Sequence, residues 1–505
     1  MKIALTTLNA KYIHSNLALR YLFAVAGQAR NTLEIREFTI NHEDDYIYTE
    51  LLRGEYGAIC FSCYIWNIER ILYLAETIKK AKPDLIIVLG GPEAGHRGEE
   101  LLKNYKAIDL IVMGEGEETF PDLLALLLKQ SPRDLEAISG LIYRRNGDIC
   151  VNPAREVDFN QVPFPYSYTG SESDKIVYYE SSRGCPFSCS YCLSSTNLGV
   201  RSLSLEQVKR DLSFFIHNKV KQVKLVDRTF NYDKIRAIEI FRYLMNVDNK
   251  FTNFHFELCG ELMNEEMLQL LEKARPGLFQ FEIGIQSTNQ PTLDAINRKG
   301  DFSKLSANVR RLRSKNNIHL HLDLIAGLPF EDYDTFAHSF NQVYALKPHH
   351  LQLGFLKLLP GTQIRRQADD YEYVYRDHPP YEVISNRFLS AEGLARIKML
   401  ETVFSLYYNR GGFSNTLDFA TGQLGMEAFC FYEELAYFYH LKGFQHRSHR
   451  KESLYRILHL YGWWKDKYLP GTGKKMEQIL LQDINQSLNS EVAKKIQMEG
   501  WGPEG

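Results

Sequence analysis

The sequence has few cysteines, no long apolar run and no excess of charge of one sign. Eight cysteines among 505 residues are too few to build a disulfide scaffold. No apolar run approaches the roughly 20 residues of a membrane span, and the first residues lack the pattern of a secretory signal. The net charge of -2 excludes a strongly basic protein that binds nucleic acid over most of its surface. We therefore expect a cytoplasmic protein with reduced thiols and no membrane partner.

The composition is that of a globular protein with several domains. Apolar residues make up 44% of the chain and charged residues 24%, a balance that allows a sizeable buried core. At about 100–200 residues per domain, this length predicts two to four domains. The pattern of strands and helices divides the chain into residues 1–135, a linker at 136–171, residues 172–365 and residues 366–505.

In residues 1–135, short apolar strands alternate with helices. The strands are expected at Ile3–Thr7, Ala58–Tyr64, Leu85–Leu89 and Leu110–Met113. This alternation predicts a Rossmann-like, doubly wound α/β domain whose parallel sheet has helices on both faces. Ligands of such sheets bind at the carboxyl ends of the strands. The loops expected at that edge are Thr7–Asn16, Ser62–Asn67, Gly90–His96 and Gly114–Glu118.

Residues 172–365 contain a second strand–helix alternation. Its six apolar strands are expected at Ile176–Glu180, Gln222–Val226, His255–Cys259, Gln280–Ile285, His319–Ile325 and Leu351–Leu356. Without a glycine-rich dinucleotide fingerprint, six such units favour a full or partial (β/α) barrel with its active site at the carboxyl ends of the strands. The linker before the barrel carries a hairpin signal at Asn146 and Gly147. Residues 366–505 are expected to form a helical region that caps the barrel.

Three of the eight cysteines lie within eight residues, just after the first barrel strand. They are Cys185, Cys189 and Cys192. Structural zinc normally takes four ligands, and the next cysteine is the distant Cys259. Three thiolates on one loop suit a cubane iron–sulfur cluster with one iron left open for a substrate or cofactor. The alternatives are a zinc knuckle with a distant fourth ligand, or buried thiols.

This Cys-x3-Cys-x2-Cys loop, with Tyr191 just before the last cysteine, resembles the radical S-adenosylmethionine (radical SAM) superfamily. The resemblance implies that Cys185, Cys189 and Cys192 hold a [4Fe–4S] cluster whose open iron chelates S-adenosylmethionine. An electron from the reduced cluster then cleaves the cofactor to a 5′-deoxyadenosyl radical. It also implies a reducing partner such as flavodoxin or ferredoxin.

The same resemblance implies further contacts with S-adenosylmethionine. Asp227 follows the second barrel strand, where the family often has a glycine-rich turn that this sequence lacks. Glu257 resembles a carboxylate near the cofactor. Gln286, Arg298 and Asp323 resemble residues of the oxygen-independent coproporphyrinogen oxidase branch, in which an arginine can bind the carboxylate and an aspartate the ribose. The alternative for each is a polar residue that satisfies the barrel rim.

The first domain resembles the cobalamin-binding domain that precedes the barrel in one radical SAM branch. The resemblance rests on the order of short motifs after its strands, and it implies cobalamin contacts at Ser62, Tyr64, Gly90, Gly91, Pro92, Glu93, Gly114, Glu115 and Gly116. Small residues there let a corrin ring approach the backbone closely. The alternative is a flavodoxin-like domain for a flavin or nucleotide. His14 lacks the aspartate that precedes a cobalt-binding histidine in many such domains, so we expect a loop or helix-cap histidine.

These features together predict a cobalamin-dependent radical SAM enzyme, acting as a monomer, that methylates an unactivated carbon. Alternatives are a radical rearrangement, cyclisation or oxidation, or a cobalamin or redox sensor without turnover. The expected substrate is a small molecule, a peptide or a nucleoside, and the near-neutral charge disfavours a large RNA.

Overall fold

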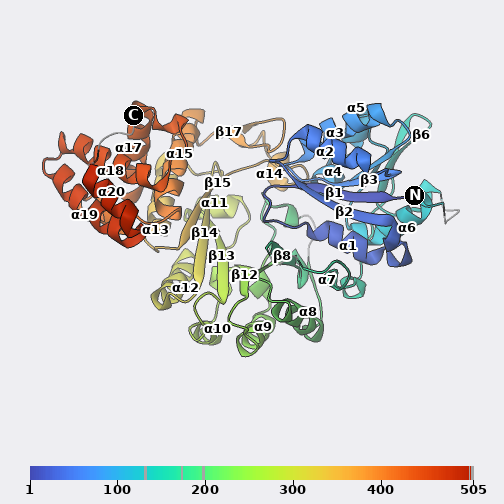
Figure 1. Ribbon diagram of the computed structural model, residues 1–505, viewed down its shortest axis with the longest axis horizontal. Coiled ribbons are helices and arrows are strands. Elements are labelled where there is room, and N and C mark those ends of the chain that lie inside the picture. Colours follow the sequence, from blue (N-terminus) through green and yellow to red (C-terminus); the bar gives the residue numbers. More distant parts are fainter. Residues whose placement is uncertain (130–133, 172–173, 196–198, 500, 502–505) are drawn as a thin grey trace.

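The computed structural model describes residues 1–505 except 130–133, 172–173, 196–198, 500 and 502–505. Figure 1 shows three parts side by side: an α/β part that includes the amino terminus, a central sheet flanked by helices, and a helical part that includes the carboxyl-terminal helices. The central part touches both of the others. No helix among the described residues is long and apolar enough to cross a membrane.

The first part is a seven-stranded sheet with the strand order β2-β1-β3-β4-β5-β6-β7. Its first five strands are parallel and run at Ile3–Asn9 (β1), Leu33–Thr39 (β2), Ala58–Ser62 (β3), Ile86–Gly90 (β4) and Leu110–Val112 (β5). The helices between them are α1 (Leu17–Val25), α2 (Asp44–Arg53), α3 (Ile68–Ala81), α4 (Pro92–His96), α5 (Gly98–Asn104) and α6 (Gly116–Leu127). Two separate apolar cores form around this sheet, which confirms the doubly wound domain.

The last two strands of this sheet come from the segment that the sequence suggested as a linker. Strands β6 (Leu141–Arg145) and β7 (Asp148–Val151) pair antiparallel to each other, and β6 pairs with β5. The expected hairpin turn is present, because Asn146 and Gly147 have φ values of 52° and 94°, the two positive angles of a type I′ turn. The hairpin therefore extends the first sheet.

The second part is a parallel six-stranded sheet in the order β15-β14-β13-β12-β11-β8. The strands are β8 (Ile176–Tyr179), β11 (Gln222–Leu225), β12 (Asn253–Leu258), β13 (Phe279–Gln286), β14 (His319–Ala326) and β15 (His350–Phe355). The main helices that cover it are α8 (Leu205–His217), α9 (Lys234–Asn246), α10 (Glu265–Leu271), α12 (Phe302–Lys315) and α13 (Tyr333–Tyr344). Because its first and last strands do not pair, this sheet is a partial (β/α)6 barrel, as expected.

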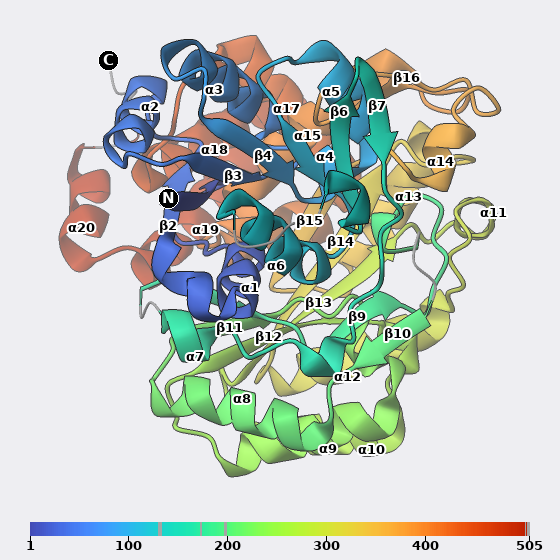
Figure 2. The ribbon, with the colours of Figure 1, turned by 90° about the vertical axis from the view of Figure 1, so that its right-hand side faces the viewer.

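The carboxyl-terminal part is helical, as the sequence predicted. Its main helices are α15 (Ala391–Phe404), α17 (Ala428–Lys442), α18 (Lys451–Asp466), α19 (Thr472–Ser487) and α20 (Ser490–Glu499). Its aromatic residues share one apolar cluster with the barrel. Phe340 of α13, for example, packs edge-to-face on Phe429 of α17 with 5.7 Å between ring centroids. The helical part is therefore fastened to the last βα unit of the barrel, and in Figure 2 it lies behind the first sheet.

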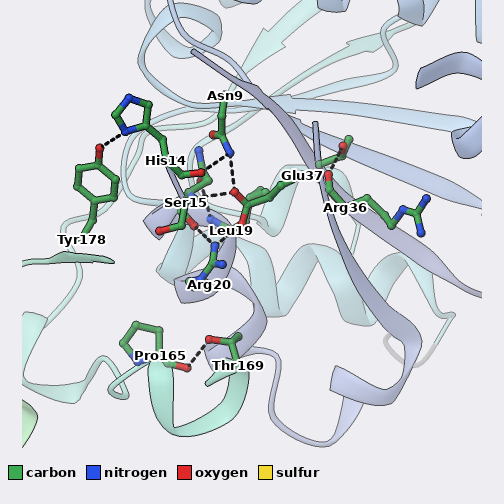
Figure 3. Close-up of polar contacts among 12 residues, drawn as sticks. Asn9, His14, Ser15, Leu19, Arg20, Arg36, Glu37, Pro165, Thr169 and Tyr178 are labelled. Atoms are coloured by element: carbon green, nitrogen blue, oxygen red, sulfur yellow. Dashed lines mark hydrogen bonds and ion pairs between the residues drawn. The ribbon is translucent and has the colours of Figure 1, made fainter. Parts of the chain in front are cut away.

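The loop after β1 links the first sheet to the barrel (Figure 3). A buried ion pair between Arg20 and Glu37 anchors it, and Glu37 also accepts hydrogen bonds from Asn9 Nδ2 at 2.6 Å and from the backbone N of Asn16 at 3.0 Å. A charge buried in this way needs such partners to offset its desolvation. At the tip of the same loop, His14 Nδ1 lies 2.7 Å from the Tyr178 hydroxyl of β8.

Candidate functional site

The three clustered cysteines lie on a loop that begins at the end of strand β9 (Ser182–Cys185), which pairs with β10 (Gly199–Ser202). The middle of this loop is held from two sides. The backbone N of Ser190 donates to the oxygen of Ile296 at 2.9 Å, and the backbone N of Ile364 donates to the oxygen of Ser190 at 2.9 Å. The loop conformation therefore depends on segments that follow β13 and β15.

The thiols of this loop lie in a polar environment. Burial raises the pKa of the Cys189 thiol, and the nearby Arg298 guanidinium opposes that rise. Among the described residues, no three His, Cys, Asp or Glu side chains gather closely enough to hold one metal ion. A cubane cluster makes a different demand, because each thiolate binds a different iron and the ligands need not converge on one point. Three cysteines on one loop, with a guanidinium beside Cys189, fit an anionic iron–sulfur cluster.

The structure brings Tyr191, Gln286 and Arg298 together beside this loop. Burial raises the pKa of the Tyr191 hydroxyl, and the Arg298 charge opposes that rise. Arg298 Nη2 donates to the backbone oxygen of Gly284. A Cβ atom on Gly284 would lie 2.3 Å from Gln286 Nε2, so a side chain at this position would displace the Gln286 amide.

Gln286 has two features of a ligand-binding residue. It sits at a β-bulge at the end of β13 with a φ of 72°, a strained angle for a residue with a side chain. Its Oε1 atom is buried and finds no hydrogen-bond partner among the described residues. A buried acceptor without a partner is costly, and a bound ligand with a donor would satisfy it. These observations fit S-adenosylmethionine.

Glu257 and Asp323 lie in a charged layer on the barrel strands. Lys224 Nζ lies 2.8 Å from Glu282 Oε2 and 3.6 Å from Glu257 Oε1. Burial raises the pKa of Glu257, whereas hydrogen bonding and positive charge hold the pKa of Glu282 well below its usual range despite burial. His321 Nε2 lies 3.0 Å from Asp323 Oδ1 without the alignment of a hydrogen bond. Sequence reasoning missed Lys224 and Glu282, which a search for charged residues on apolar strands would have found.

Asp227 supports the segment before the cysteine loop. Its carboxylate is buried and accepts hydrogen bonds from the backbone N of Ser181 at 3.0 Å and from the hydroxyls of Ser181 and Ser182, both at 2.6 Å. These bonds fix the segment that leads to Cys185, so the structure gives Asp227 a positioning role. A direct contact between Asp227 and S-adenosylmethionine stays a prediction.

Glu331 is a buried carboxyl group that sequence reasoning also missed. It follows β14, and its Oε1 accepts hydrogen bonds from the hydroxyls of Ser287 at 2.5 Å and Ser339 at 3.0 Å. Ser287 directly follows Gln286, so Glu331 supports the residue with the strained backbone. The only sequence signal was an acidic residue shortly after a barrel strand.

Replacing Glu331 with glutamine is expected to remove a pH dependence of stability. Burial raises the pKa of Glu331 from 4.5 to about 7. The native protein therefore keeps a proton that the unfolded chain releases, and the contribution of this group to stability falls as the pH rises from about 4.5 to 7. The loss should be on the order of 3 kcal/mol. Urea unfolding from pH 5 to pH 8 measures it, with the exposed Glu99→Gln as control. Equal pH profiles for the wild type and both variants would contradict the expectation.

The carboxyl edge of the first sheet has the close backbone approaches expected of a cofactor edge. Gly91 has a φ of 91°, and a Cβ atom there would lie 2.7 Å from the backbone oxygen of Cys63. Nearby, the Tyr64 ring stacks on Trp66 with 4.4 Å between centroids, and Trp66 is 46% exposed. A flat aromatic pair and a glycine turn at one sheet edge fit a large planar ligand such as a corrin ring.

The acidic residues expected at this edge are engaged in contacts between domains. Glu115 accepts from Arg201 Nη2 at 2.5 Å and lies 3.6 Å from Arg183 Nη1. Glu93 is buried and accepts from the Tyr381 hydroxyl of the carboxyl-terminal part. The remaining residues expected there, Ser62, Gly90, Pro92, Gly114 and Gly116, end or follow β3, β4 and β5. All the proposed cobalamin contacts stay predictions.

A cavity of about 340 Å³ separates the first sheet from the barrel. Glu115 lines it from the first part, and Glu180, Arg183, Arg201 and Arg228 line it from the second, close to the cysteine loop. Glu115, from the edge where cobalamin is expected, and Gly184, Leu193 and Ser194, next to the cluster cysteines, therefore border one cavity.

Neighbouring contacts and burial explain two further features of the first domain, His14 and the pair Cys60 and Cys63. The ring of His14 is hydrogen-bonded to Tyr178, and burial lowers its pKa, which agrees with a loop histidine. Cys60 and Cys63 are buried free thiols, and burial raises the pKa of Cys60 to about 12. These two cysteines behave as core residues.

Comparison with known families matches each part of the chain. A model of the B12 binding domain matches residues 3–124, and a model of the radical SAM superfamily matches residues 179–343. A model described as a protein of unknown function (DUF4080) matches residues 369–498. The first two matches coincide with the first sheet and the barrel.

Relatives and solved structures agree with these matches. The cobalamin-dependent radical SAM methyltransferase TokK of Streptomyces tokunonensis is 25% identical over 349 residues, which cover 64% of this chain and 50% of TokK. Hopanoid C-3 methylase of Methylococcus capsulatus is 23% identical over 366 residues, which cover 69% of this chain and 67% of that protein. The chain thus spans about half the length of the first of these relatives.

Two cobalamin proteins of known structure share the fold. The cobalamin-dependent S-adenosylmethionine radical enzyme OxsB, with aqua-cobalamin bound, has a TM-score of 0.64 at 15% identity, covering 99% of this chain and 83% of OxsB. The methyltransferase TsrM from Kitasatospora setae, with cobalamin and a [4Fe-4S] cluster bound, has a TM-score of 0.60 at 17% identity, covering 76% and 82%. The matched domains imply a [4Fe–4S] cluster, S-adenosylmethionine and cobalamin, which confirms the cofactor prediction. The chain thus contains a B12-binding domain followed by a radical SAM domain, the combination found in cobalamin-binding radical S-adenosylmethionine proteins.

Proposed function

We propose that the protein is a cobalamin-dependent radical SAM methyltransferase that methylates an unactivated carbon. The observation that carries this proposal is the cavity that Glu115 of the first domain shares with Gly184, Leu193 and Ser194, which lie next to the cluster cysteines. When bound, the cluster with S-adenosylmethionine supplies a carbon radical by hydrogen abstraction, and cobalamin supplies the methyl group. The methyltransferase names of TokK and hopanoid C-3 methylase support methylation over rearrangement, cyclisation or oxidation.

The side chains near the cysteine loop would bind the cluster and S-adenosylmethionine. Cys185, Cys189 and Cys192 would bind the cluster. Gln286 would donate and accept hydrogen bonds toward S-adenosylmethionine, since its Oε1 has no partner among the described residues. Arg298, already positioned by Gly284, would bind the carboxylate of that cofactor.

The ion pairs between the two domains would keep the cavity closed. Arg183 contacts Glu117 of the first domain and Glu180 of the barrel, and its side chain is 11% exposed. Charge pairs shielded from water in this way are stronger than surface pairs. They would hold the corrin edge at a fixed distance from the cluster loop and exclude water from the space between them.

The remaining partners follow from the same proposal. A reduced flavodoxin or ferredoxin would supply electrons, and the protein would act as a cytoplasmic monomer. The free state of all eight cysteines is compatible with a reducing compartment.

The test uses the full chain reconstituted with iron, sulfide and hydroxocobalamin. With dithionite and S-adenosylmethionine, it should release 5′-deoxyadenosine and retain the corrinoid through gel filtration. A protein with full cluster content that releases no 5′-deoxyadenosine would instead support the sensor. Retention of a flavin in place of the corrinoid would overturn the assignment of the first domain.

The substrate can be sought in cells. Metabolites and modified nucleosides of a deletion strain are compared with the parent after feeding of methionine labelled in its methyl group. A product that lacks one labelled methyl in the deletion strain supports methylation. A difference in ring closure or oxidation state, with no labelled methyl missing, would overturn methylation in favour of the other radical chemistries.

A further inference from the structure

A second cavity, of about 400 Å³, lies where the first domain meets the segment after β15. His96, Arg97 and Glu100 line it from α4 and α5, and residues 360–366, including the short helix α14 (Gln363–Arg366), line it from the other side. We call it the arginine pocket, because Arg97, Arg365 and Arg366 all face it. Nothing in the proposed chemistry uses these three arginines.

The arginine pocket carries unbalanced positive charge. Arg97 is paired, since it contacts Glu100 at 2.5 Å and Glu93 at 3.2 Å. Arg365 and Arg366 differ: within the described parts of the chain, their recorded hydrogen bonds go to the backbone oxygens of Leu358 and Gly361, and neither arginine pairs with a carboxylate. Glu100 also lines the pocket, and the charges of Arg97 and Arg365 lower the pKa of its carboxyl. One carboxylate therefore faces three guanidinium groups, and net positive charge remains in the pocket.

The walls of this pocket are well fixed. The Arg365 guanidinium lies 4.9 Å from the centroid of the Tyr381 ring, and Arg97 Nη1 donates to the Tyr381 hydroxyl at 2.8 Å. Gly361 has a φ of 88°, and a Cβ atom there would lie 2.7 Å from the ring of His96. The glycine therefore lets the imidazole approach the backbone of the opposite wall. Such preorganisation lowers the entropic cost of binding a ligand.

The pocket also lies between the two cofactor loops. On one side, His96 and Arg97 directly follow the turn at residues 90–93, where cobalamin contacts are expected. On the other side, Ile364 donates its backbone N–H to Ser190 of the cysteine loop, and Gln363 accepts from Asn297 Nδ2 at 3.1 Å. A ligand group held here is therefore close to the segments that shape both cofactor sites.

We propose that the arginine pocket binds an oxyanion of the phosphate class. Guanidinium groups match phosphate oxygens with paired N–H donors, and a neutral imidazole can add another. The same chemistry occurs in the phosphodiester of the cobalamin nucleotide loop and in a phosphorylated substrate. The experiment therefore has one arm that detects the site and one that identifies the source.

The first arm measures binding of inorganic phosphate to the full chain without cobalamin, by isothermal titration calorimetry. Arg365→Gln and Arg366→Gln should each weaken phosphate binding at least tenfold. Arg387→Gln, which removes an exposed arginine paired with Glu372, should leave it unchanged. The proposal is overturned if phosphate does not bind, or if the control variant weakens binding as much as the pocket variants. Within the part of the chain that the structure describes, the hydrogen bond recorded for Arg366 goes to Gly361, so its variant keeps the test valid if Arg365→Gln misfolds.

The second arm compares cobinamide, which lacks the phosphate, with cobinamide phosphate. If cobinamide phosphate binds more tightly and Arg365→Gln removes the difference, the corrinoid is the source of the oxyanion. If the two corrinoids bind equally and inorganic phosphate still binds to the cobalamin-loaded protein, the source is the substrate. Either result supports the site. Both arms measure binding alone, so they do not depend on whether the protein proves to be a methyltransferase.

Discussion

Replacing Cys185 with alanine is expected to abolish the visible absorption of the iron–sulfur cluster and all cleavage of S-adenosylmethionine. Three cysteines of the chain lie on this loop, and Asp227, Ser181 and Ser182 hold the backbone that presents the first of them. Without one of its three ligands, a cubane cluster loses an iron site or fails to assemble. Activity should fall to the background level of the assay, and iron content measured after anaerobic reconstitution should fall with it.

The control for this experiment is Cys430→Ala. Cys430 is an exposed free thiol on α17, in the helical part of the chain. Its removal should leave both absorption and cleavage unchanged. If Cys185→Ala still cleaves S-adenosylmethionine at a rate near that of the control, the three-cysteine site is wrong. If both variants lose the cluster, the loss does not depend on which cysteine is replaced, and the assignment of the cluster to the three-cysteine loop would fail as well.

Replacing Gly91 with alanine is expected to weaken cobalamin binding at least tenfold and to lower stability. At its φ of 91° a side chain adds strain, and the new Cβ would lie 2.7 Å from the backbone oxygen of Cys63. Gly91 also has a ψ of 171°, and this combination of angles is essentially restricted to glycine, at a cost of about 1–3 kcal/mol for a residue with a side chain. The clash must in addition move Cys63 or the turn, and both belong to the edge where the corrin is expected. Corrinoid retained through gel filtration and the midpoint of thermal unfolding measure the two effects.

Gly27→Ala is the matched control for this variant. Gly27 also has a positive φ, of 56°, but a Cβ atom there meets nothing within 4 Å. It should therefore lose stability through backbone strain alone and keep wild-type corrinoid binding. Full retention of cobalamin by Gly91→Ala would show that the corrin does not use this edge. Equal loss by both variants would show that the effect comes from global destabilisation.

Local patterns in the sequence were sufficient for the main elements of the fold. The barrel strands alternate inward and outward residues at a period of two, and the buried first-domain strands are continuous apolar runs, so both could be located. Strand β2 was missed because its sequence, Leu33–Thr39, mixes charged and apolar residues as edge strands do. The hairpin at β6 and β7 was located, but its pairing with β5 depends on Arg144, which reaches three backbone oxygens in residues 102–108.

Some features of the candidate site could likewise be predicted from the sequence, and others could not. The cysteine spacing is a local property, and the resemblance assigned Gln286 and Arg298 to one cofactor, which agrees with their proximity in the structure. The positioning role of Asp227 could not be predicted, because its three bonds to Ser181 and Ser182 join segments about 45 residues apart in the chain. The arginine pocket could not be predicted, since its walls are more than 250 positions apart in the chain.

By itself, the sequence determined the order of the domains, the three-cysteine loop and the resemblance to cobalamin-binding radical SAM proteins, because each depends on residues that are close together in the chain. Only the tertiary structure decided which charges face each other. Arg183 contacts Glu117 because folding packs the edge of the first sheet against the loops of the barrel. Tyr381 contacts Glu93 because the segment after β15 packs against the same edge. Charges are stable in such buried places only with a partner, and the partner is chosen by packing of distant segments.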